Sequence, residues 1–218
     1  MRKIWDISQP LRPDLPVWPG DTAFQRQDNW VISEDCPVKV SRLTLSTHSG
    51  AHADAPEHYD RSGQDIASVA LDPYLGECVL VTAGGTGVDV TPEDLDWNAI
   101  GAHTRVLVRT YERFPHAQWD SEFRAVNAAT IERLAVAGCK LIGTDAASLD
   151  PETSKTLDAH HAVKRHDMRI LEGLVFDGVP DGRYELIALP LPIVNADASP
   201  VRAVLRELRN DTRRDQGA

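Results

Sequence analysis

Short apolar segments separated by polar residues recur along the chain and predict a mixture of strands and helices. The first is VKVSRLTLS at 38–46, whose largely alternating apolar positions predict a strand. Later runs rich in valine, leucine and isoleucine predict further strands, at 77–83, 104–110 and 140–145. Between the last two, NAATIERLAVAGC at 127–139 has the spacing of an amphipathic helix that ends at Gly138.

Two other segments bear on the class of fold. TPEDLDWNAI at 91–100 predicts the start of a helix, since Thr91 can cap it and Pro92 suits its first turn. SPVRAVLREL at 199–208 alternates like a strand, yet its composition would suit a helix, so both assignments stay open. The alternation of strands and helices from 77 to 145 predicts an α/β core. A length of 218 residues fits a single domain over 1–218.

The first 37 residues are expected to form an irregular N-terminal arm. They contain five prolines, including those of LRPDLPVWPGD, and such a segment must be held by packing or by a partner. Trp18 lies in the stretch PVWPG, between two prolines that stiffen the chain. Its indole can anchor the arm against the core or against a second subunit.

Charge and composition exclude several classes of protein. With 33 acidic and 23 basic residues the formal charge is −10, which disfavours a nucleic-acid partner. No run of eighteen apolar residues predicts a membrane span, and MRKIWDISQP lacks the apolar core of a secretory signal. The three cysteines are isolated and without CxxC spacing, so a reducing cytoplasm is expected. Any metal site should therefore use nitrogen and oxygen ligands.

Three histidines and an aspartate lie within eleven positions, in HSGAHADAPEH: His48, His52, Asp54 and His58. Imidazole nitrogen and carboxylate oxygen are ligands of borderline divalent metals. Gly50 and Pro56 favour a turning backbone, and Ser49 stands where an HExxH protease motif would need glutamate. The cluster follows the predicted strand 38–46, so its ligands would lie on a loop fixed by the scaffold. Two histidines and a carboxylate also form the facial triad of non-haem iron oxygenases, and spacing alone does not separate the two kinds of site.

A second group of polar residues lies far downstream. His160 and His161 are adjacent, so only one can point inward in a regular backbone, and neither is favoured. Glu172 lies in the apolar stretch RILEGL, where burial costs several kcal/mol unless a cation neutralises the carboxylate. An exposed turn explains Glu172 equally well. Asp145 follows a predicted strand and can either face a site or cap a turn, so it is left out of the predicted site.

Taken together, several motifs resemble a known family nearly end to end. They are HSGAHADAPEHYD at 48–60, GTDAASLDPETSKTLDAHH at 143–161, and YELIALPL with DASPVRAVLREL towards the C-terminus. The chain resembles the bacterial arylformamidase branch of the cyclase-like metal-dependent hydrolase family. The wider family has the signature HxGTHxDxPxH; here Ala51 replaces the threonine, as expected for this branch. Glu57 stands where the branch often has an apolar residue.

The resemblance implies a fold, a metal centre and a reaction. It implies the cyclase-like α/β fold, with a mixed β-sheet core flanked by helices, and two zinc ions per subunit. The substrate would be N-formyl-L-kynurenine, cleaved to L-kynurenine and formate in tryptophan degradation by a homodimeric enzyme. The first zinc ion would be held by His48, His52 and Asp54, and the second by Asp54, His160 and Glu172. His58 would be the general acid/base, and Trp18 would contact the substrate ring.

Three other functions remain open. Another cyclase-like hydrolase, for instance one that opens the lactam ring of isatin with a single manganese ion, would share the scaffold. An iron-dependent oxygenase would need His48, His52 and Asp54 but neither His160 nor Glu172. A protein that only binds metal for stability is the third, although structural zinc sites are normally closed by four protein ligands.

Overall fold

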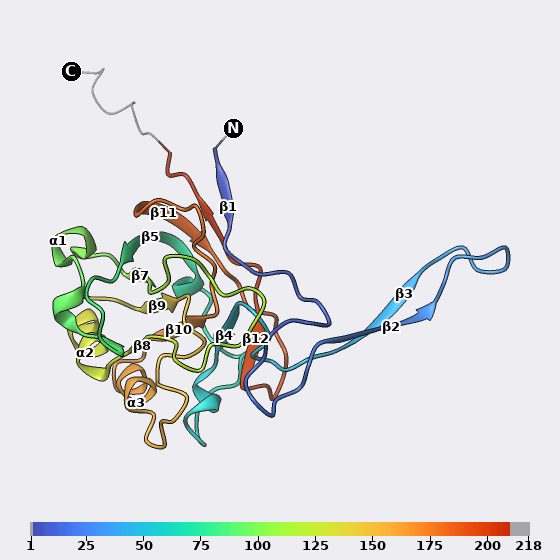
Figure 1. The fold of residues 1–218 in the computed structure, drawn as a ribbon, viewed down its shortest axis with the longest axis horizontal. Coiled ribbons are helices and arrows are strands. Elements are labelled where there is room, and N and C mark those ends of the chain that lie inside the picture. The colour runs from blue at the N-terminus through green and yellow to red at the C-terminus, as the bar shows by residue number, and fades with distance from the viewer. Residues whose placement is uncertain (1, 210–218) are drawn as a thin grey trace.

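The computed structural model describes residues 2–209, and most of its strands join one large sheet (Figure 1). In chain order, the nine strands of this sheet are β1 Ile4–Asp6, β4 His52–Asp54, β5 Leu75–Thr82, β7 Arg105–Arg109, β9 Leu141–Thr144, β10 Arg169–Glu172, β11 Gly182–Ile187, β12 Ala198–Pro200 and β13 Val204–Arg206. Their order across the sheet is β1-β13-β11-β5-β7-β9-β10-β4-β12. The four strands β5, β7, β9 and β10 are parallel, and the strands on both sides of them pair antiparallel. The sheet is mixed, which confirms the expected fold class.

Three helices pack on one face of the sheet: α1 Trp97–Ile100, α2 Ala128–Val136 and α3 Asp158–Arg165 (Figure 1). Because successive side chains of a strand point to opposite faces, every second residue of the central strands points at these helices. The strand residues of this layer are mostly valine and isoleucine. They share one buried cluster with the helices, which includes Val79, Val81, Val106, Val108, Ile142, Ile170, Ile131, Leu134 and Val163.

The other face of the sheet packs against the sheet's own flanking strands. Leu80, Leu107 and Leu171 of the central strands belong to the same buried cluster as Leu186 of β11 and Leu205 of β13. A sheet whose outer strands contact the face of its centre is curled. The described connections also contain three 3₁₀ turns, Pro56–His58, Asp72–Tyr74 and Pro92–Asp94, and a small parallel ladder of β6 Asp89–Val90 with β8 Ala125–Val126.

Most of the central elements agree with the sequence predictions. The strands expected at 77–83, 104–110 and 140–145 are β5, β7 and β9, and the helix expected at 127–139 is α2. Segment 91–100 forms a 3₁₀ turn followed by the short α1, and Thr91 forms the expected cap, with Asp94 as its partner. Segment 199–208, left open between strand and helix, contributes to the two strands β12 and β13.

The irregular arm expected over 1–37 is not confirmed as one unit: residues 7–24 contain no helix or strand, but two stretches on either side of them form strands. Residues 4–6 form β1, which pairs antiparallel with β13 at the edge of the main sheet. Residues 25–30 form β2 Gln25–Trp30, which pairs with β3 Val40–Thr44. Proline content predicted missing structure, but the prolines of this region lie outside both strands.

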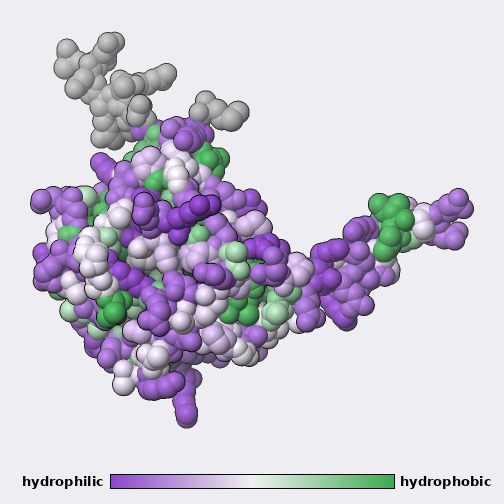
Figure 2. All heavy atoms as spheres, viewed as in Figure 1, coloured by the Kyte–Doolittle hydropathy of each residue, from purple (hydrophilic) through white to green (hydrophobic). Residues whose placement is uncertain are grey.

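The segment that projects from the molecule is the β2–β3 ribbon (Figure 1). The strand expected at 38–46 is present as β3, yet all five of its residues are exposed. Its apolar alternation therefore faces no core within this chain. Large apolar side chains are exposed near the turn between β2 and β3: Trp30 is 58% and Ile32 is 66% exposed. Figure 2 shows such a hydrophobic group near the tip of the projecting ribbon.

No helix of the described residues 2–209 is both long enough and apolar enough to cross a bilayer.

Candidate metal centre

The pairing of β4 with β10 brings two distant stretches of the sequence together. The two strands are antiparallel, with His52 opposite Glu172 and Asp54 opposite Ile170. His52 and Asp54 are two residues apart and so point to the same face of the sheet. That face is the one covered by the helices, because Ile170 packs in the cluster beneath them. The open question of Glu172 is thereby answered, since its side chain is buried.

Asp54 lies at the centre of the group. Its Oδ1 is 3.2 Å from His48 Nδ1 and 3.4 Å from His52 Nε2. Its Oδ2 is 3.6 Å from His160 Nε2. One carboxylate oxygen therefore faces the histidines of the 48–52 segment, and the other faces helix α3.

Glu172 is placed in the same way between two imidazoles. Its Oε2 is 3.5 Å from His52 Nε2, and its Oε1 is 3.7 Å from His160 Nε2. The backbone N–H of Leu149 donates a hydrogen bond of 2.7 Å to Oε1. Asp54 and Glu172 are thus two carboxylates that each face more than one imidazole nitrogen.

The histidines are held by their remaining ring nitrogens. His52 Nδ1 lies 2.9 Å from the carbonyl oxygen of Gly50, and His160 Nδ1 lies 2.6 Å from Asp150 Oδ2. Asp150 also accepts the backbone N–H groups of Ala159 and His160. This pattern is typical of metal-binding histidines, whose second nitrogen is fixed by an outer partner. In both residues the free nitrogen, Nε2, is the one that faces the carboxylates.

Four buried atoms at this centre lack a hydrogen-bond partner among the described residues: His52 Nε2, His160 Nε2, and both carboxylate oxygens of Asp54. Unpaired buried polar atoms are costly and rare in folded proteins. Imidazole nitrogens and carboxylate oxygens that converge without hydrogen bonds suit a divalent cation. The donor set therefore fits a metal of the nitrogen- and oxygen-binding kind.

The pKa shifts of these side chains also show that the buried carboxylates attract positive charge. Burial would raise the pKa of Asp54, but the facing imidazoles of His160, His48 and His52 hold it well below its usual range. Burial lowers the pKa of His160, yet Asp150, Asp54 and Glu172 outweigh it and raise this pKa to about 10. In the same way, Asp197 and Asp54 overcome burial and raise the pKa of His48 to about 10. Without a metal ion, protons supply the charge that the carboxylates attract.

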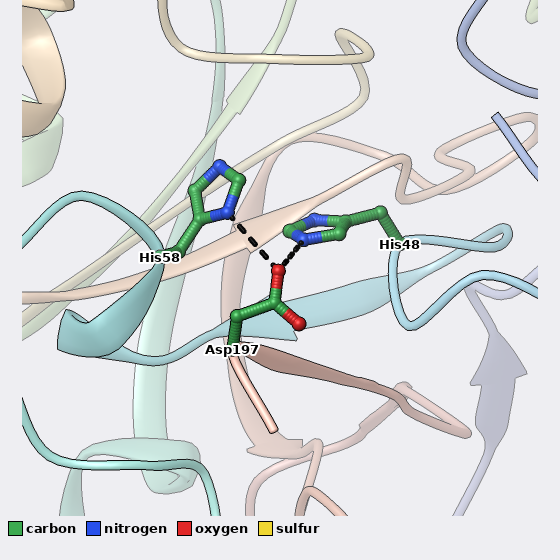
Figure 3. A group of neighbouring side chains, drawn as sticks. All are labelled: His48, His58 and Asp197. Atoms are coloured by element: carbon green, nitrogen blue, oxygen red, sulfur yellow. Dashed lines mark hydrogen bonds and ion pairs between the residues drawn. The ribbon is translucent and has the colours of Figure 1, made fainter. Parts of the chain in front are cut away.

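His58 lies beside this group and is partly open to solvent. Its ring centroid is 4.3 Å from that of His48 and 5.8 Å from that of His160. Figure 3 shows His48 and His58 turned towards one carboxylate, that of Asp197. Asp197 Oδ2 is 2.9 Å from His48 Nε2 and 3.3 Å from His58 Nδ1. These two contacts hold the pKa of Asp197 below its usual range.

A cavity of about 340 Å³ opens onto the group. Its lining combines His48, His52, His58, His160 and Glu172 with the aromatic residues Trp18, Tyr111, Phe114 and Trp119. The ring of Trp18 meets that of Trp119 edge to face, with 5.4 Å between centroids. Both functions considered for Trp18 from the sequence are compatible with this position, because its indole packs on the core and also lines the cavity.

Asp150 and Asp197 were missed by the sequence analysis. Asp150 stands ten positions before His160, and Asp197 lies within the DASP stretch that supports the family resemblance. His161, adjacent to His160, is exposed on the outer side of α3. The phase of this helix selects His160.

Asp145, which the sequence left without a role, is buried beside the cavity and anchors a loop. Its Oδ1 accepts the backbone N–H and the hydroxyl of Thr110, both at 2.7 Å. Its Oδ2 accepts the backbone N–H of Tyr111 at 3.2 Å. Burial outweighs these hydrogen bonds and raises the pKa of Asp145 to about 6. The contacts describe a structural carboxylate at the base of the loop that brings aromatic residues to the cavity.

The family model described as "Putative cyclase" matches residues 5–151. The chain belongs to the cyclase family. A protein of Maricaulis maris named kynurenine formamidase is 73% identical over 95% of this chain and 100% of its own length. Proteins of the same name from Sphingopyxis alaskensis and Bordetella pertussis are 58% and 54% identical, with the same coverage. The resemblance found in the sequence is confirmed.

Comparison with solved structures shows that the fold is that of cyclase-like metal-dependent hydrolases. A structure described as a potential metal-dependent hydrolase with cyclase activity has a TM-score of 0.83 and is 26% identical, covering 96% of this chain and 100% of its own. Isatin hydrolase A from Labrenzia aggregata has a TM-score of 0.74 at 20% identity, covering 95% of this chain and 94% of its own, and shares the fold. His160 and Glu172 of the candidate metal centre lie beyond the residues that the family model matches.

Gly173 provides a test of how tightly the two halves of this cyclase-family site are coupled. It has a φ of +62°, and a Cβ there would lie 2.6 Å from the carbonyl oxygen of Gly50, which contacts His52. We expect Gly173→Ala to displace Gly50 and His52 and to weaken metal binding about 10–100-fold, as loss of an outer partner does. Metal titration of the purified variant measures this change.

Gly138→Ala is the matched control. Gly138 also has a positive φ, of +94°, but nothing lies within 4 Å of the position that a Cβ would take. It should lose a similar amount of stability from backbone strain while keeping its metal affinity. Equal metal affinities in the two variants would contradict the coupling.

Asp145→Asn tests the structural role of the buried carboxyl group. Because its folded pKa of about 6 exceeds the ordinary value of 3.8, the native state binds the proton more tightly than the unfolded chain does. The resulting stability is present below about pH 4 and is lost as the pH rises to about 6, by about 3 kcal/mol in total. Asparagine does not titrate, so the variant should gain stability relative to the wild type across this window. Urea unfolding of both proteins between pH 4 and 7 measures the difference; a difference independent of pH would count against the shift.

Proposed function

We propose that this protein is a zinc-dependent arylformamidase that hydrolyses N-formyl-L-kynurenine to L-kynurenine and formate in tryptophan degradation. The observation that carries the proposal is the pair of buried carboxylates, Asp54 and Glu172, each facing two or more imidazole nitrogens. Support for the substrate comes from relatives named kynurenine formamidase that are 54–73% identical over 95% of the chain.

Two zinc ions per subunit are proposed, and the residues present fit them. His48, His52 and Asp54 would hold the first ion, and Asp54, His160 and Glu172 the second. The unpaired buried atoms support this assignment, since the two oxygens of Asp54 face different histidines. Zinc bound there would supply activated water at neutral pH and a Lewis acid for the formyl oxygen.

His58 is proposed as the general acid/base. Hydrolysis of an aryl formamide expels an aromatic amine, whose nitrogen must receive a proton when the C–N bond breaks. His58 lines the cavity, and Asp197 contacts its Nδ1, which leaves Nε2 for proton exchange with the substrate. Proton transfer by a positioned imidazole contributes about 10²–10⁴-fold to the rate.

Trp18 is proposed to contact the aromatic ring of the substrate. It lines the cavity with Tyr111, Phe114 and Trp119, and such a wall suits a planar aryl group. The cavity volume of about 340 Å³ lies at the lower end of the range typical for small-molecule sites. A cytoplasmic location is proposed with this role, since Cys36, Cys78 and Cys139 are all free thiols.

The rival functions account for less of the centre. An iron-dependent oxygenase with a facial triad uses His48, His52 and Asp54 and leaves His160 and Glu172 without a role, although both lie within 4 Å of these ligands. A hydrolase with a single manganese ion leaves one of the two imidazole–carboxylate groups unused. A structural zinc site has no need of an adjoining cavity.

His58→Ala tests the mechanism. Zinc content should remain at two per chain, because His58 is not among the proposed ligands, while kcat for kynurenine release should fall about 10²–10⁴-fold. Elemental analysis combined with an absorbance assay for kynurenine measures both quantities. His161→Ala is the matched control, since this exposed neighbour of His160 should leave both unchanged.

Two outcomes would separate the parts of this proposal. A wild-type enzyme that holds two zinc ions and releases no kynurenine would overturn the substrate. A zinc-loaded His58→Ala variant with unchanged kcat would remove His58 from the mechanism.

A homodimer held in part by the β2–β3 ribbon is also proposed. An isolated two-stranded ribbon is at best marginally stable in water, and this one exposes large apolar side chains. A second copy of the chain would cover them.

Replacing Trp30 and Ile32 together by serine should shift the protein from dimer to monomer in light scattering. Replacing Val88 and Val136, which are 84% and 87% exposed elsewhere on the molecule, should not. A wild-type monomer would contradict the proposal.

A further inference from the structure

Asp197 connects the proposed general acid/base to a proposed metal ligand. A single carboxylate oxygen, Oδ2, is 3.3 Å from His58 Nδ1 and 2.9 Å from His48 Nε2 (Figure 3). A carboxylate can only accept hydrogen bonds, so each of these ring nitrogens donates its hydrogen to Asp197. The contact therefore fixes which nitrogen of each ring carries the proton.

Asp197 is itself held through both its side chain and its backbone. The hydroxyl of Thr47 donates a hydrogen bond of 2.9 Å to its other oxygen, Oδ1. The carbonyl oxygen of Asp197 accepts the backbone N–H of Ala55 at 2.8 Å. The next residue, Ala198, pairs with Asp54 in the register of β12 with β4. Asp197 is thus anchored to the same strand that supplies the metal ligands.

We propose that Asp197 is a positioning residue for the reaction, which holds His58 in the tautomer and orientation that present Nε2 to the substrate. Free imidazole exchanges between two tautomers and rotates about its side-chain bonds. An acceptor on Nδ1 removes both freedoms and leaves Nε2 as the atom that exchanges the proton. Because the same oxygen contacts His48, Asp197 also fixes the position of the His58 ring relative to the proposed metal centre.

A second interpretation of the same group is that it binds a cation. The ligand atoms of His48, His58 and Asp197 all lie within 4.8 Å of one another, so they could hold a metal ion. The two nitrogens already contact the carboxylate at hydrogen-bond distance, which explains the arrangement without an ion. Metal analysis of a variant distinguishes the two interpretations.

The inference rests on the proposed function, and Asp197→Asn tests it. The change keeps the size of the side chain and removes its charge and one of its two acceptor oxygens. In enzyme loaded with excess zinc, kcat for kynurenine release should fall at least about tenfold. The fall should not exceed the contribution of His58 itself, which is about 10²–10⁴-fold. KM, and the zinc content measured at this saturating zinc concentration, should stay near the wild-type values.

A double-mutant cycle gives a result that a merely structural role would not. If Asp197 acts through His58, Asp197→Asn should have no further effect on kcat in the His58→Ala background. An additional loss of tenfold or more in that background would overturn the proposal. Because Asp197 is also the outer partner of His48, Asp197→Asn is expected to weaken zinc affinity. A loss of kcat that disappears once the variant is fully loaded with zinc would assign Asp197 to metal binding and overturn the proposal.

Asp65→Asn is the control for loosening of the turn that carries Asp197. Asp65 accepts the backbone N–H of Asn195 at 2.7 Å and so anchors the same turn without contacting either histidine. Its kcat should match that of the wild type; a loss equal to that of Asp197→Asn would mean that both act by holding the turn. If Asp197→Asn does not fold, Thr47→Val removes the hydroxyl that fixes the carboxylate and should lower kcat in the same direction to a smaller extent.

Nitrogen NMR of His58 separates this proposal from the proposed function. In the zinc-loaded wild type, Nδ1 of His58 should carry the proton, and this preference should be lost in Asp197→Asn. A wild type that shows the Nδ1–H tautomer but releases no kynurenine would overturn the function and leave the positioning role intact. A His58 that shows no tautomer preference would overturn the positioning role alone.

Discussion

Buried negative charge is the constraint on which the rest of this structure depends. Asp54 is fully buried and Glu172 is 3% exposed, and an ionised carboxylate in such a place costs several kcal/mol unless positive charge compensates it. The surrounding imidazoles direct their free nitrogens at these oxygens, while Gly50 and Asp150 hold the opposite nitrogens. The centre is therefore organised around cations, whether protons or metal ions occupy it.

The fold meets this requirement through register and close packing of backbone. The antiparallel pairing of β4 with β10 sets His52 against Glu172, and α3 adds His160 from the layer above. The missing Cβ of Gly173 allows its backbone to approach Gly50 closely. The core on both faces of the curled sheet fixes these strands, so the arrangement of the candidate ligands follows from the same packing that stabilises the domain.

Sequence reasoning succeeded where the chemistry is local and stopped where it depends on register. The cluster from His48 to His58 was visible because its members are neighbours in the chain. The burial of Glu172 and the choice of His160 depend on strand pairing and helix phase, which the pattern of residues left open. Asp150 and Asp197 are two of 33 acidic residues, and only tertiary contacts distinguish them from carboxylates exposed to solvent.

The N-terminal region shows the opposite error. Its prolines predicted an irregular arm up to residue 37, whereas the chain forms an edge strand at 4–6 and a ribbon from 25 onwards. The alternation at 38–46 predicted a strand, and β3 is present there without a core beneath it. Periodicity reports that one face is apolar; it does not report what that face contacts.

The pairing of β1 with β13 sets Ile4 beside Arg206, so the first and last strands of the chain are neighbours. A short peptide linker from the end of β13 to the start of β1 would therefore close the described backbone into a ring with little disturbance of the sheet. New ends opened at the tip of the projecting ribbon would give a circular permutant whose ribbon strands are separate chain termini. Such a permutant could be shortened one residue at a time, so that the role of the ribbon in the proposed dimer could be measured without altering any residue of the candidate metal centre.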